Sequence, residues 1–384
     1  MKNVRDFKID EWMRLYGVGN RYALEGSYAQ ALSINNLKSL STDPALEVFD
    51  QNLELSYGPF EGSHRLRERI AALHSTNEDK IDPSNVIITP GSIMANYLIL
   101  DTICGPEDHV ICQYPTYGQL YLVPEFGGVD VSLWKMDESN NWLPDTKELA
   151  ALIRPNTKAI ILQSFSRIVL EESFLRDVVR IACENSIVVF SDEVFNPLVF
   201  TSPKPPSIVN LGYTNTIASG SLSKAFSIPG IRLGWIVTRS PELTKEITTK
   251  RDFTTITVSR LDDSVASFAL DPAVMPNMMK RNISLCQESV GLLDKFIAES
   301  GGRVRWVKPQ GSGMAFIQIL DQARVPVDDG EFCKRLQVEE SICLVPGGVC
   351  FSEGSNEDFK GYFRVGLGNP DVLRQALPLL HAFI

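Results

Sequence analysis

The chain has 384 residues, of which 44% are hydrophobic and 22% charged, an ordinary composition for a globular enzyme. Its formal net charge of −10 argues against nucleic acid or an anionic membrane surface as a partner. No apolar run reaches transmembrane length, and the amino-terminal segment MKNVRDFKIDEW is too charged for a signal peptide. The seven cysteines form no CxxC pair, so we expect reduced cysteines, no metal site and a cytoplasmic location.

From residue 84 onward, short apolar runs alternate with helical patterns, which predicts an α/β fold with a mostly parallel sheet. The runs are apolar throughout rather than alternating, so helices should cover both faces of the sheet. The predicted strands include NVIITPGS, HVICQYPTY, KAIILQSF and SIVVFSDEVF. Gly91, Tyr117, Asp192 and Lys224 all fall at strand ends. Because ligands bind at the carboxyl ends of parallel strands, we expect these four residues to share one site.

The pattern changes near residue 275. A long amphipathic helix, MKRNISLCQESVGLLDKFIAES, stops at Gly301 and Gly302, and strands and helices of an α+β kind follow, among them the strand ICLVP. We therefore expect two domains, a large one over residues 51–275 and a small one formed by residues 1–50 and 276–384.

The segment SGSLSKAFSIPGIRLGWIV contains a lysine among hydroxyls, glycines and an arginine, between two runs typical of buried strands. Lys224 at the mouth of a sheet can lose its proton by desolvation and act as a nucleophilic amine. Ser221, Ser223 and Arg232 would suit a bound phosphate. Together these residues suggest a Schiff-base lysine that holds pyridoxal 5'-phosphate (PLP). Taken alone, Ser-x-Ser-Lys is equally consistent with a lysine in a surface loop.

Several segments together resemble the class I/II aminotransferases, which have the type I fold of PLP enzymes. The lysine motif matches closely, and similar segments are SYGPFEGSHRLRERIA, TPGSIMAN, PTYGQLY, SDEVF and YFRVGLG. The resemblance runs from about residue 5 to the last residue. Within the class, FKIDEWM, SYGPFEGS and RDFTTITVS are nearest to a capreomycidine-synthase-like branch. The resemblance implies a large domain with a mostly parallel sheet between helices, plus a smaller α+β domain.

The resemblance also implies catalytic roles. Lys224 would form the internal aldimine and then act as the base that moves the substrate α-proton. Asp192 would pair with the protonated pyridine nitrogen and keep the ring an electron sink. The alternative for Asp192 is a solvated carboxylate in a loop, but a charge directly after the run SIVVF needs a partner.

The remaining matches imply binding roles. The phosphate would be held by the residues Gly91, Ser92, Ile93, Ser221, Ser223 and Arg232, the first three through backbone N–H groups at a helix start. Tyr117 would stack on the ring, unless it is a core tyrosine. Arg364 would bind the substrate α-carboxylate as a bidentate pair. Tyr57 would reach the phosphate of a neighbouring subunit in a homodimer, although alone it is typical of a strand edge. Glu25 is a candidate for the substrate pocket, but a charge on a helix face is the preferred interpretation.

The chain departs from the family after KAII, where an asparagine and a proline-rich segment are expected and LQSFSRIVLEES occurs instead. Phe195 replaces the tyrosine that normally shares the cofactor ring oxygen with that asparagine. Candidates to substitute are Gln163, Ser164, Ser166 and Arg167. The loss of these hydrogen bonds should alter the pKa of the lysine–cofactor Schiff base.

Three hypotheses follow. The first, which we favour, is a PLP-dependent transferase acting through an external aldimine at the α-amino group of an L-amino acid, by transamination with a 2-oxo acid. The second is elimination, replacement or cyclisation on the same fold, as in the capreomycidine-synthase-like branch and specialised biosynthesis. The third is a non-catalytic protein that binds PLP, which the presence of Lys224, Asp192 and Arg364 disfavours.

Overall fold

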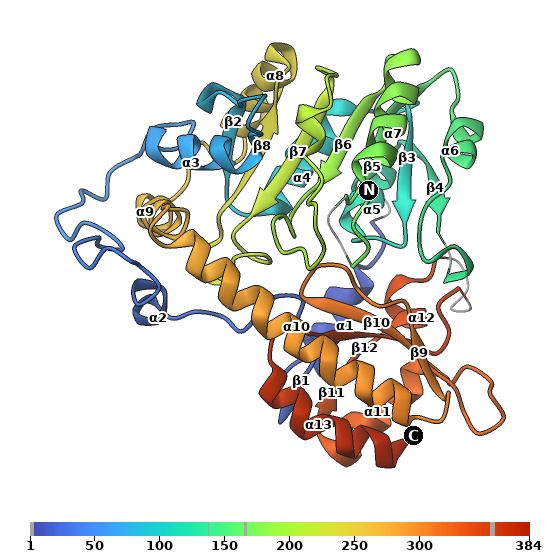
Figure 1. The fold of residues 1–384 in the computed structure, drawn as a ribbon. Coiled ribbons are helices and arrows are strands. Elements are labelled where there is room, and N and C mark those ends of the chain that lie inside the picture. Colours follow the sequence, from blue (N-terminus) through green and yellow to red (C-terminus); the bar gives the residue numbers. More distant parts are fainter. Residues whose placement is uncertain (1–3, 137, 165–166, 354–357) are drawn as a thin grey trace.

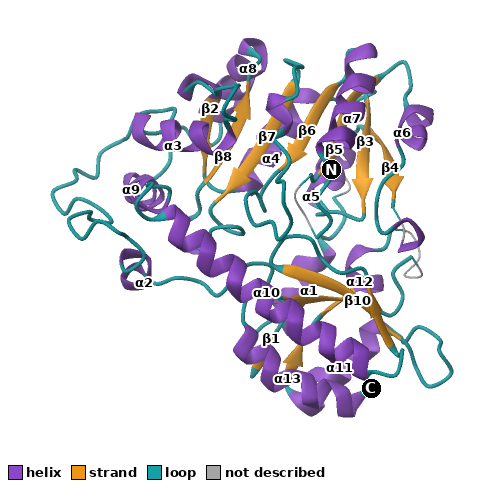
Figure 2. Cartoon of the chain, viewed as in Figure 1, coloured by secondary structure: helices purple, strands orange, loops and turns teal. Residues whose placement is uncertain are grey.

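The computed structural model describes residues 4–136, 138–164, 167–353 and 358–384. A seven-stranded sheet and a four-stranded sheet form its two main parts (Figure 1). The arrowheads in Figure 2 show that the parallel strands of the larger sheet end on the side that faces the smaller one. Among the described residues, no helix combines the length and the apolar character needed to cross a membrane.

The larger sheet has the strand order β2-β8-β7-β6-β5-β3-β4. Its strands are β2 (Val86–Thr89), β3 (His109–Tyr114), β4 (Asp130–Lys135), β5 (Thr157–Leu162), β6 (Val188–Asp192), β7 (Thr216–Ser221) and β8 (Gly234–Thr238). Only β8 runs against its neighbours, antiparallel to both β2 and β7. The other six strands therefore end at one edge, and the predicted mostly parallel α/β sheet is confirmed.

Both faces of the central strands of this sheet are buried, as the continuous apolar runs predict. Successive residues of β5 enter opposite clusters, because side chains alternate across a strand. Ile160 packs in one cluster with α7 (Glu172–Glu184), and Ile161 packs in the other with α4 (Ser92–Ile103). The remaining helices are α1 (Lys8–Tyr16), α2 (Ile34–Lys38), α3 (His64–His74), α5 (Gln119–Gly127), α6 (Thr146–Leu152), α8 (Pro241–Asp252), α9 (Arg260–Ala269), α10 (Met275–Glu299), α11 (Asp329–Glu340), α12 (Gly347–Phe351) and α13 (Pro370–Phe383).

The smaller sheet is antiparallel, with the order β12-β13-β10-β9. Its strands are β9 (Val304–Trp306), β10 (Met314–Ile319), β12 (Val345–Pro346) and β13 (Tyr362–Gly366). The long predicted helix is α10, which runs from beside the larger sheet to the smaller one (Figure 1). It begins at Met275, about one turn earlier than its apolar pattern suggests, because Pro276 is compatible with the first turn of a helix.

The amino-terminal segment joins this smaller part of the molecule. β1 (Tyr22–Ala23) pairs in parallel with β11 (Ile342–Cys343). The prediction of one strand over ICLVP is therefore wrong, since β11 and β12 belong to different sheets. Leu344 between them offers its carbonyl oxygen to the indole N–H of Trp12 at 3.2 Å instead of continuing one ladder. The division into domains at residues 50/51 and 275/276 stays a prediction.

Candidate active site

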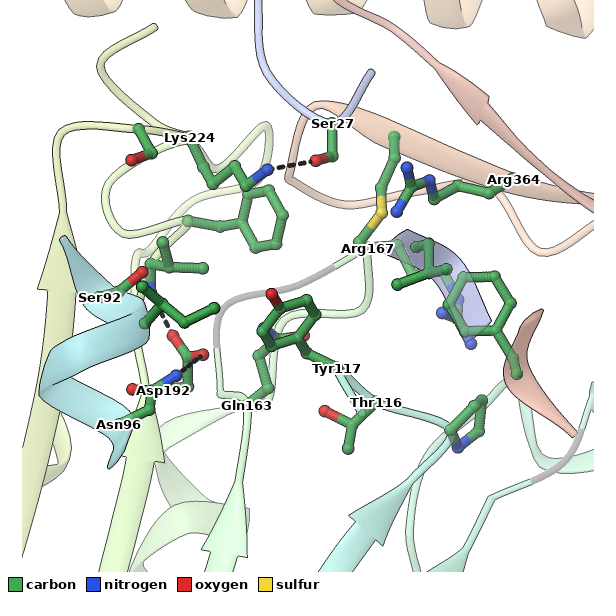
Figure 3. Close-up of a pocket in the computed structure, with 18 of the residues that line it drawn as sticks. Ser27, Ser92, Asn96, Thr116, Tyr117, Gln163, Arg167, Asp192, Lys224 and Arg364 are labelled. Atoms are coloured by element: carbon green, nitrogen blue, oxygen red, sulfur yellow. Dashed lines mark hydrogen bonds between the residues drawn. The ribbon is translucent and has the colours of Figure 1, made fainter. Parts of the chain in front are cut away.

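A pocket of about 240 Å³ lies where the carboxyl edge of the larger sheet faces the smaller sheet (Figure 3). Eight of the predicted site residues line it: Ser92, Ile93, Tyr117, Asp192, Ser223, Lys224, Arg232 and Arg364. The structure therefore brings residues from the ends of several strands together with an arginine of the smaller sheet. Such an edge is the expected ligand site of an open α/β sheet.

Three predicted residues do not line the pocket. Gly91 directly precedes the lining residue Ser92, and the Ser221 hydroxyl accepts a hydrogen bond from the Ser223 N–H at 3.2 Å. Tyr57 lies in a loop with 80% of its surface exposed, so its interpretation as a strand-edge tyrosine is wrong. Its segment contributes nothing to the pocket of its own chain.

Lys224 lies in the turn after β7, and its Nζ donates to the Ser27 hydroxyl at 2.7 Å. Burial and, to a lesser extent, the nearby positive charge of Arg364 together lower the pKa of Lys224 to about 8, against the opposing effect of Asp192. At neutral pH a fraction of this side chain is therefore the neutral amine that nucleophilic and base chemistry requires. The alternative of an ordinary surface lysine is wrong.

Asp192 is the last residue of β6, and only 2% of it is exposed, so the alternative of a solvated loop carboxylate is wrong. Burial raises the pKa of Asp192 to about 6. Two donors oppose this shift, the Val194 N–H at 3.0 Å and the Asn96 side-chain amide at 3.1 Å. The carboxylate is fixed in place and forms no ion pair among the described residues, so it can receive a cation from a ligand.

An anion-binding cradle forms where β2 leads into α4. Gly91 has φ 79°, and the helix starts at Ser92 with free backbone N–H groups. A Cβ on Gly91 would come within 2.9 Å of Arg232 Nη2, so the absence of a side chain lets this guanidinium approach the helix start. A Cβ on Gly234 would meet the Gly91 carbonyl carbon at 2.4 Å. The dipole of α4 and the charge of Arg232 both favour an anion there.

Arg364 projects from β13 into the pocket from the smaller sheet. Its Nη2 donates to the backbone carbonyl of Glu25, and its buried Nε has no hydrogen-bond partner within the described residues. Burial lowers the pKa of Arg364, and the unpartnered Nε leaves the guanidinium incompletely paired. Such a group can form a charge-assisted pair with a carboxylate.

Glu25 does not lie on a helix, so its preferred interpretation is wrong. The pairing of β1 with β11 carries it in an extended segment beside Arg364, and burial raises the pKa of its carboxyl group. Its side chain is not among the groups that line the pocket.

The structure shows which candidates for the missing partners of the cofactor ring oxygen line the pocket. Phe195 is 3% exposed and lines the pocket, as does Gln163. The Ser164 hydroxyl is buried against the Ser191 hydroxyl at 2.6 Å, away from the lining. Ser166 lies outside the described residues. Arg167 also lines the pocket.

Two residues that hold these groups were not predicted from the sequence. Asn96 lies one helical turn after Ser92 on α4, and this spacing places both residues on the same helix face. The spacing could therefore have predicted Asn96 as a residue of the site. Asn96 accepts from the Ser219 hydroxyl at 2.7 Å while it donates to Asp192. Ser27 gave no signal, because it lies nearly 200 positions from Lys224 and only the fold brings it there.

Comparisons with known proteins agree with this geometry. A family model described as aminotransferase class I and II matches residues 30–379. Capreomycidine synthase from Streptomyces vinaceus is 26% identical over 348 residues, which cover 89% of this chain and 85% of the relative. Aspartate aminotransferase from Thermotoga maritima is 26% identical over 365 residues, 92% of each chain. The crystal structure of a PLP-dependent aminotransferase from Streptococcus suis matches with a TM-score of 0.89 and 33% identity, over 99% of this chain and 98% of that one.

Proposed function

The chain belongs to the class I and II aminotransferases and is a PLP-dependent transferase, and on this premise we propose that it moves the α-amino group of an L-amino acid to a 2-oxo acid. One observation carries the proposal: a buried lysine, a buried carboxylate and an anion-binding helix start converge on one pocket. These groups fit the cofactor, because PLP has an aldehyde for the amine, a basic ring nitrogen for the carboxylate and a phosphate for the cradle.

In this proposal each side chain has one task. PLP, when bound, withdraws electrons from the substrate α-carbon. Asp192 holds a proton at the ring nitrogen and Tyr117 covers the ring face. The N–H groups of Ser92 and Ile93, with Gly91, bind the phosphate together with Ser221, Ser223 and Arg232. Lys224 Nζ takes the α-proton and returns it, and its lowered pKa leaves a free amine available near neutral pH.

Arg364 orients the substrate in this proposal. A carboxylate on its guanidinium would be held at the small-sheet side of the pocket, opposite Asp192 (Figure 3). This placement would direct the α-carbon toward the space between Arg364 and Lys224. Ser27, which accepts from Lys224, is a positioning residue for the amine.

A second candidate function is elimination, replacement or cyclisation at the same α-carbon. The observation that favours it is the apolar Phe195 at a pocket wall where the family has a tyrosine, together with the missing asparagine. The similarity to capreomycidine synthase supports it as well. Gln163 would then be the donor to the ring oxygen, since it lines the pocket together with Tyr117 and Phe195.

A single-turnover scan separates the two functions. The enzyme loaded with PLP is mixed with each amino acid without any oxo acid, and PLP and pyridoxamine phosphate are separated by chromatography. Transamination must convert PLP to pyridoxamine phosphate in amounts that match the enzyme. If substrate is consumed while PLP remains, the second function holds and the first is wrong. The Phe195→Tyr variant should form pyridoxamine phosphate faster if the apolar wall slows transamination.

The proposal also includes a homodimer with shared active sites. The exposed loop that contains Tyr57 would reach the cofactor phosphate of the partner subunit, and the site of one chain would be incomplete without it. A cytoplasmic location is part of the proposal, supported by the seven cysteines, which all lie in the described chain and are all free.

A further inference from the structure

A third arginine lines the pocket beside Arg232 and Arg364, and the proposed chemistry does not use it. Arg167 follows β5 and lines the same pocket as Lys224 and Arg364. Its guanidinium carbon lies 5.0 Å from the ring centroid of Trp142 and 5.0 Å from that of Phe316. The two aromatic rings therefore fix where this cation lies.

No acidic group neutralises Arg167 within the part of the chain that the structure describes. Its guanidinium forms no hydrogen bond or ion pair there, and its Nε is buried without a partner. Burial lowers the pKa of Arg167 to about 10, so the side chain stays positively charged at neutral pH. Aromatic faces offset part of the cost of burying a cation, but an anion offsets much more.

Arg167 lies on the side of the pocket where Arg364 would bind the substrate. Phe316 on β10 lies directly opposite Arg364 on β13, and directly opposite residues of an antiparallel pair point to the same face. Arg167, which rests on Phe316, thus shares this face with Arg364. In Figure 3 both arginines lie across the pocket from Asp192 and Asn96. The only acidic side chain in the described lining is Asp192, on the opposite side.

We propose that Arg167 binds the second carboxylate of a dicarboxylic amino acid or 2-oxo acid and so selects this substrate class. The proposal rests on the proposed function, in which Arg364 takes the first carboxylate. Two buried guanidiniums on one face give two separate anion sites, whereas a monocarboxylic substrate would leave Arg167 buried without a counter-charge. A cationic side chain would be repelled there.

The test compares two ligands that differ by a single carboxylate, glutarate and butyrate. Their binding to the PLP-loaded enzyme is measured by calorimetry in the native protein and in three variants. Arg167→Gln removes the charge, and Arg167→Met keeps an apolar stem against the two rings. Arg180→Gln is the matched control, because Arg180 is an exposed arginine of α7 paired with Glu184. Circular dichroism verifies that each variant is folded.

The native enzyme should bind glutarate at least about tenfold more tightly than butyrate, the factor expected of a charge-assisted pair. Both Arg167 variants should lose this preference and keep butyrate affinity within about twofold, while Arg180→Gln changes neither. Equal affinities in the native enzyme would overturn the proposal. So would an equal loss for both ligands in the Arg167 variants, which would assign Arg167 to the α-carboxylate or to the cofactor ring oxygen.

The binding test does not depend on transamination. If glutarate is preferred but no pyridoxamine phosphate forms from any dicarboxylic donor, the reaction type is wrong and the assignment of Arg167 stands. If transamination proceeds with apolar donors and the glutarate preference is absent, the reaction type stands and the assignment of Arg167 is wrong.

Discussion

The chemistry of Lys224 depends on its burial. An ammonium group in water keeps a high pKa, but loss of solvent and the proximity of Arg364 make the neutral amine accessible near neutral pH. The hydrogen bond from Lys224 to Ser27 then fixes where the nitrogen lies. A reactive amine at a fixed position is what a carbonyl cofactor requires.

We predict that borohydride reduction of the purified enzyme attaches PLP to Lys224. Mass spectrometry of the digested protein should identify the modified peptide, because only a Schiff base is made permanent by this reagent. Lys224→Ala should lose both the adduct and the visible absorbance of bound PLP. Lys245→Ala, an exposed lysine on α8, is the control and should retain both. An adduct on another lysine contradicts the assignment.

Burial changes the pKa of Asp192 in the opposite direction, because it raises the pKa of a carboxyl group. Its carboxylate is buried and forms no ion pair among the described residues. Two hydrogen bonds from Asn96 and Val194, together with the charge of Lys224, only partly compensate for the loss of water. A protonated ring nitrogen would supply the missing charge.

We predict that Asp192→Asn retains PLP but loses turnover by about two orders of magnitude or more, as removal of a preorganised charge does elsewhere. Steady-state kinetics at matched PLP content is the measurement, and near-native turnover would refute the role.

The raised pKa of Asp192 also predicts how stability depends on pH in the cofactor-free protein. The folded state favours the protonated carboxyl group, so its stabilising contribution is complete below the unfolded pKa of about 4 and is lost as pH rises through about 6. Asp192→Asn is neutral throughout. Its melting temperature relative to the native protein should therefore increase between pH 4 and pH 7. A constant difference over this range would show that the carboxylate is not destabilised by burial.

At the scale of elements, the connection from β2 to α4 depends on two glycines. Gly91 has a positive φ, and Gly234 on β8 packs so closely that an added Cβ would lie 2.4 Å from the Gly91 carbonyl carbon and 2.5 Å from the Ser92 nitrogen. These are backbone atoms, so the clash is relieved only if the start of α4 moves. The N–H groups of the proposed phosphate cradle would move with it.

We predict that Gly234→Ala weakens PLP affinity by about tenfold or more, because a displaced helix start loses charge-assisted hydrogen bonds to the phosphate. Equilibrium dialysis of PLP with the purified variant measures this effect. Gly230→Ala is a matched control in the same motif, since a Cβ there meets no atom within 4 Å. The two variants should differ clearly. Equal affinities would show that the close packing of Gly234 does not position the cradle.

At the scale of the whole molecule, one surface exposes several large apolar side chains. The loop before α3 projects away from the body (Figure 1). It exposes Leu55, Tyr57 and Phe60 to 74%, 80% and 56%. The neighbouring segment before α9 exposes Phe253 to 89%, and Thr257 donates to the carbonyl of Pro59 at 3.1 Å, which joins the two segments. Large apolar side chains exposed on joined segments are typical of a protein interface.

We predict that this surface forms a homodimer in which Tyr57 completes the partner's site. Tyr57→Ala and Lys224→Ala should each be inactive, and an exchanged mixture should recover about a quarter of native activity, since half of the dimers are hybrids with one native site. Light scattering should give twice the chain mass. A monomer at working concentration, or no recovery despite verified exchange, would contradict the shared site.

Local patterns were sufficient for much of the fold and of the site. Continuous apolar runs predicted the buried strands β3, β5 and β6, because burial on both faces leaves no polar positions. The same reasoning placed Asp192 and Lys224 at strand ends, and strands that run in one direction end at one edge. Their convergence in one pocket therefore followed from topology alone.

Only the tertiary structure determined which groups face one another inside the pocket. Asn96 beside Asp192, Ser27 beside Lys224 and Arg167 stacked on Phe316 all depend on contacts between distant segments. The error at Glu25 has the same origin, since pairing of β1 with β11 overrode the local helical pattern. Hydrophobic periodicity specifies an element and its buried face, whereas side-chain partners depend on how elements pack, and that information is distributed over the whole chain.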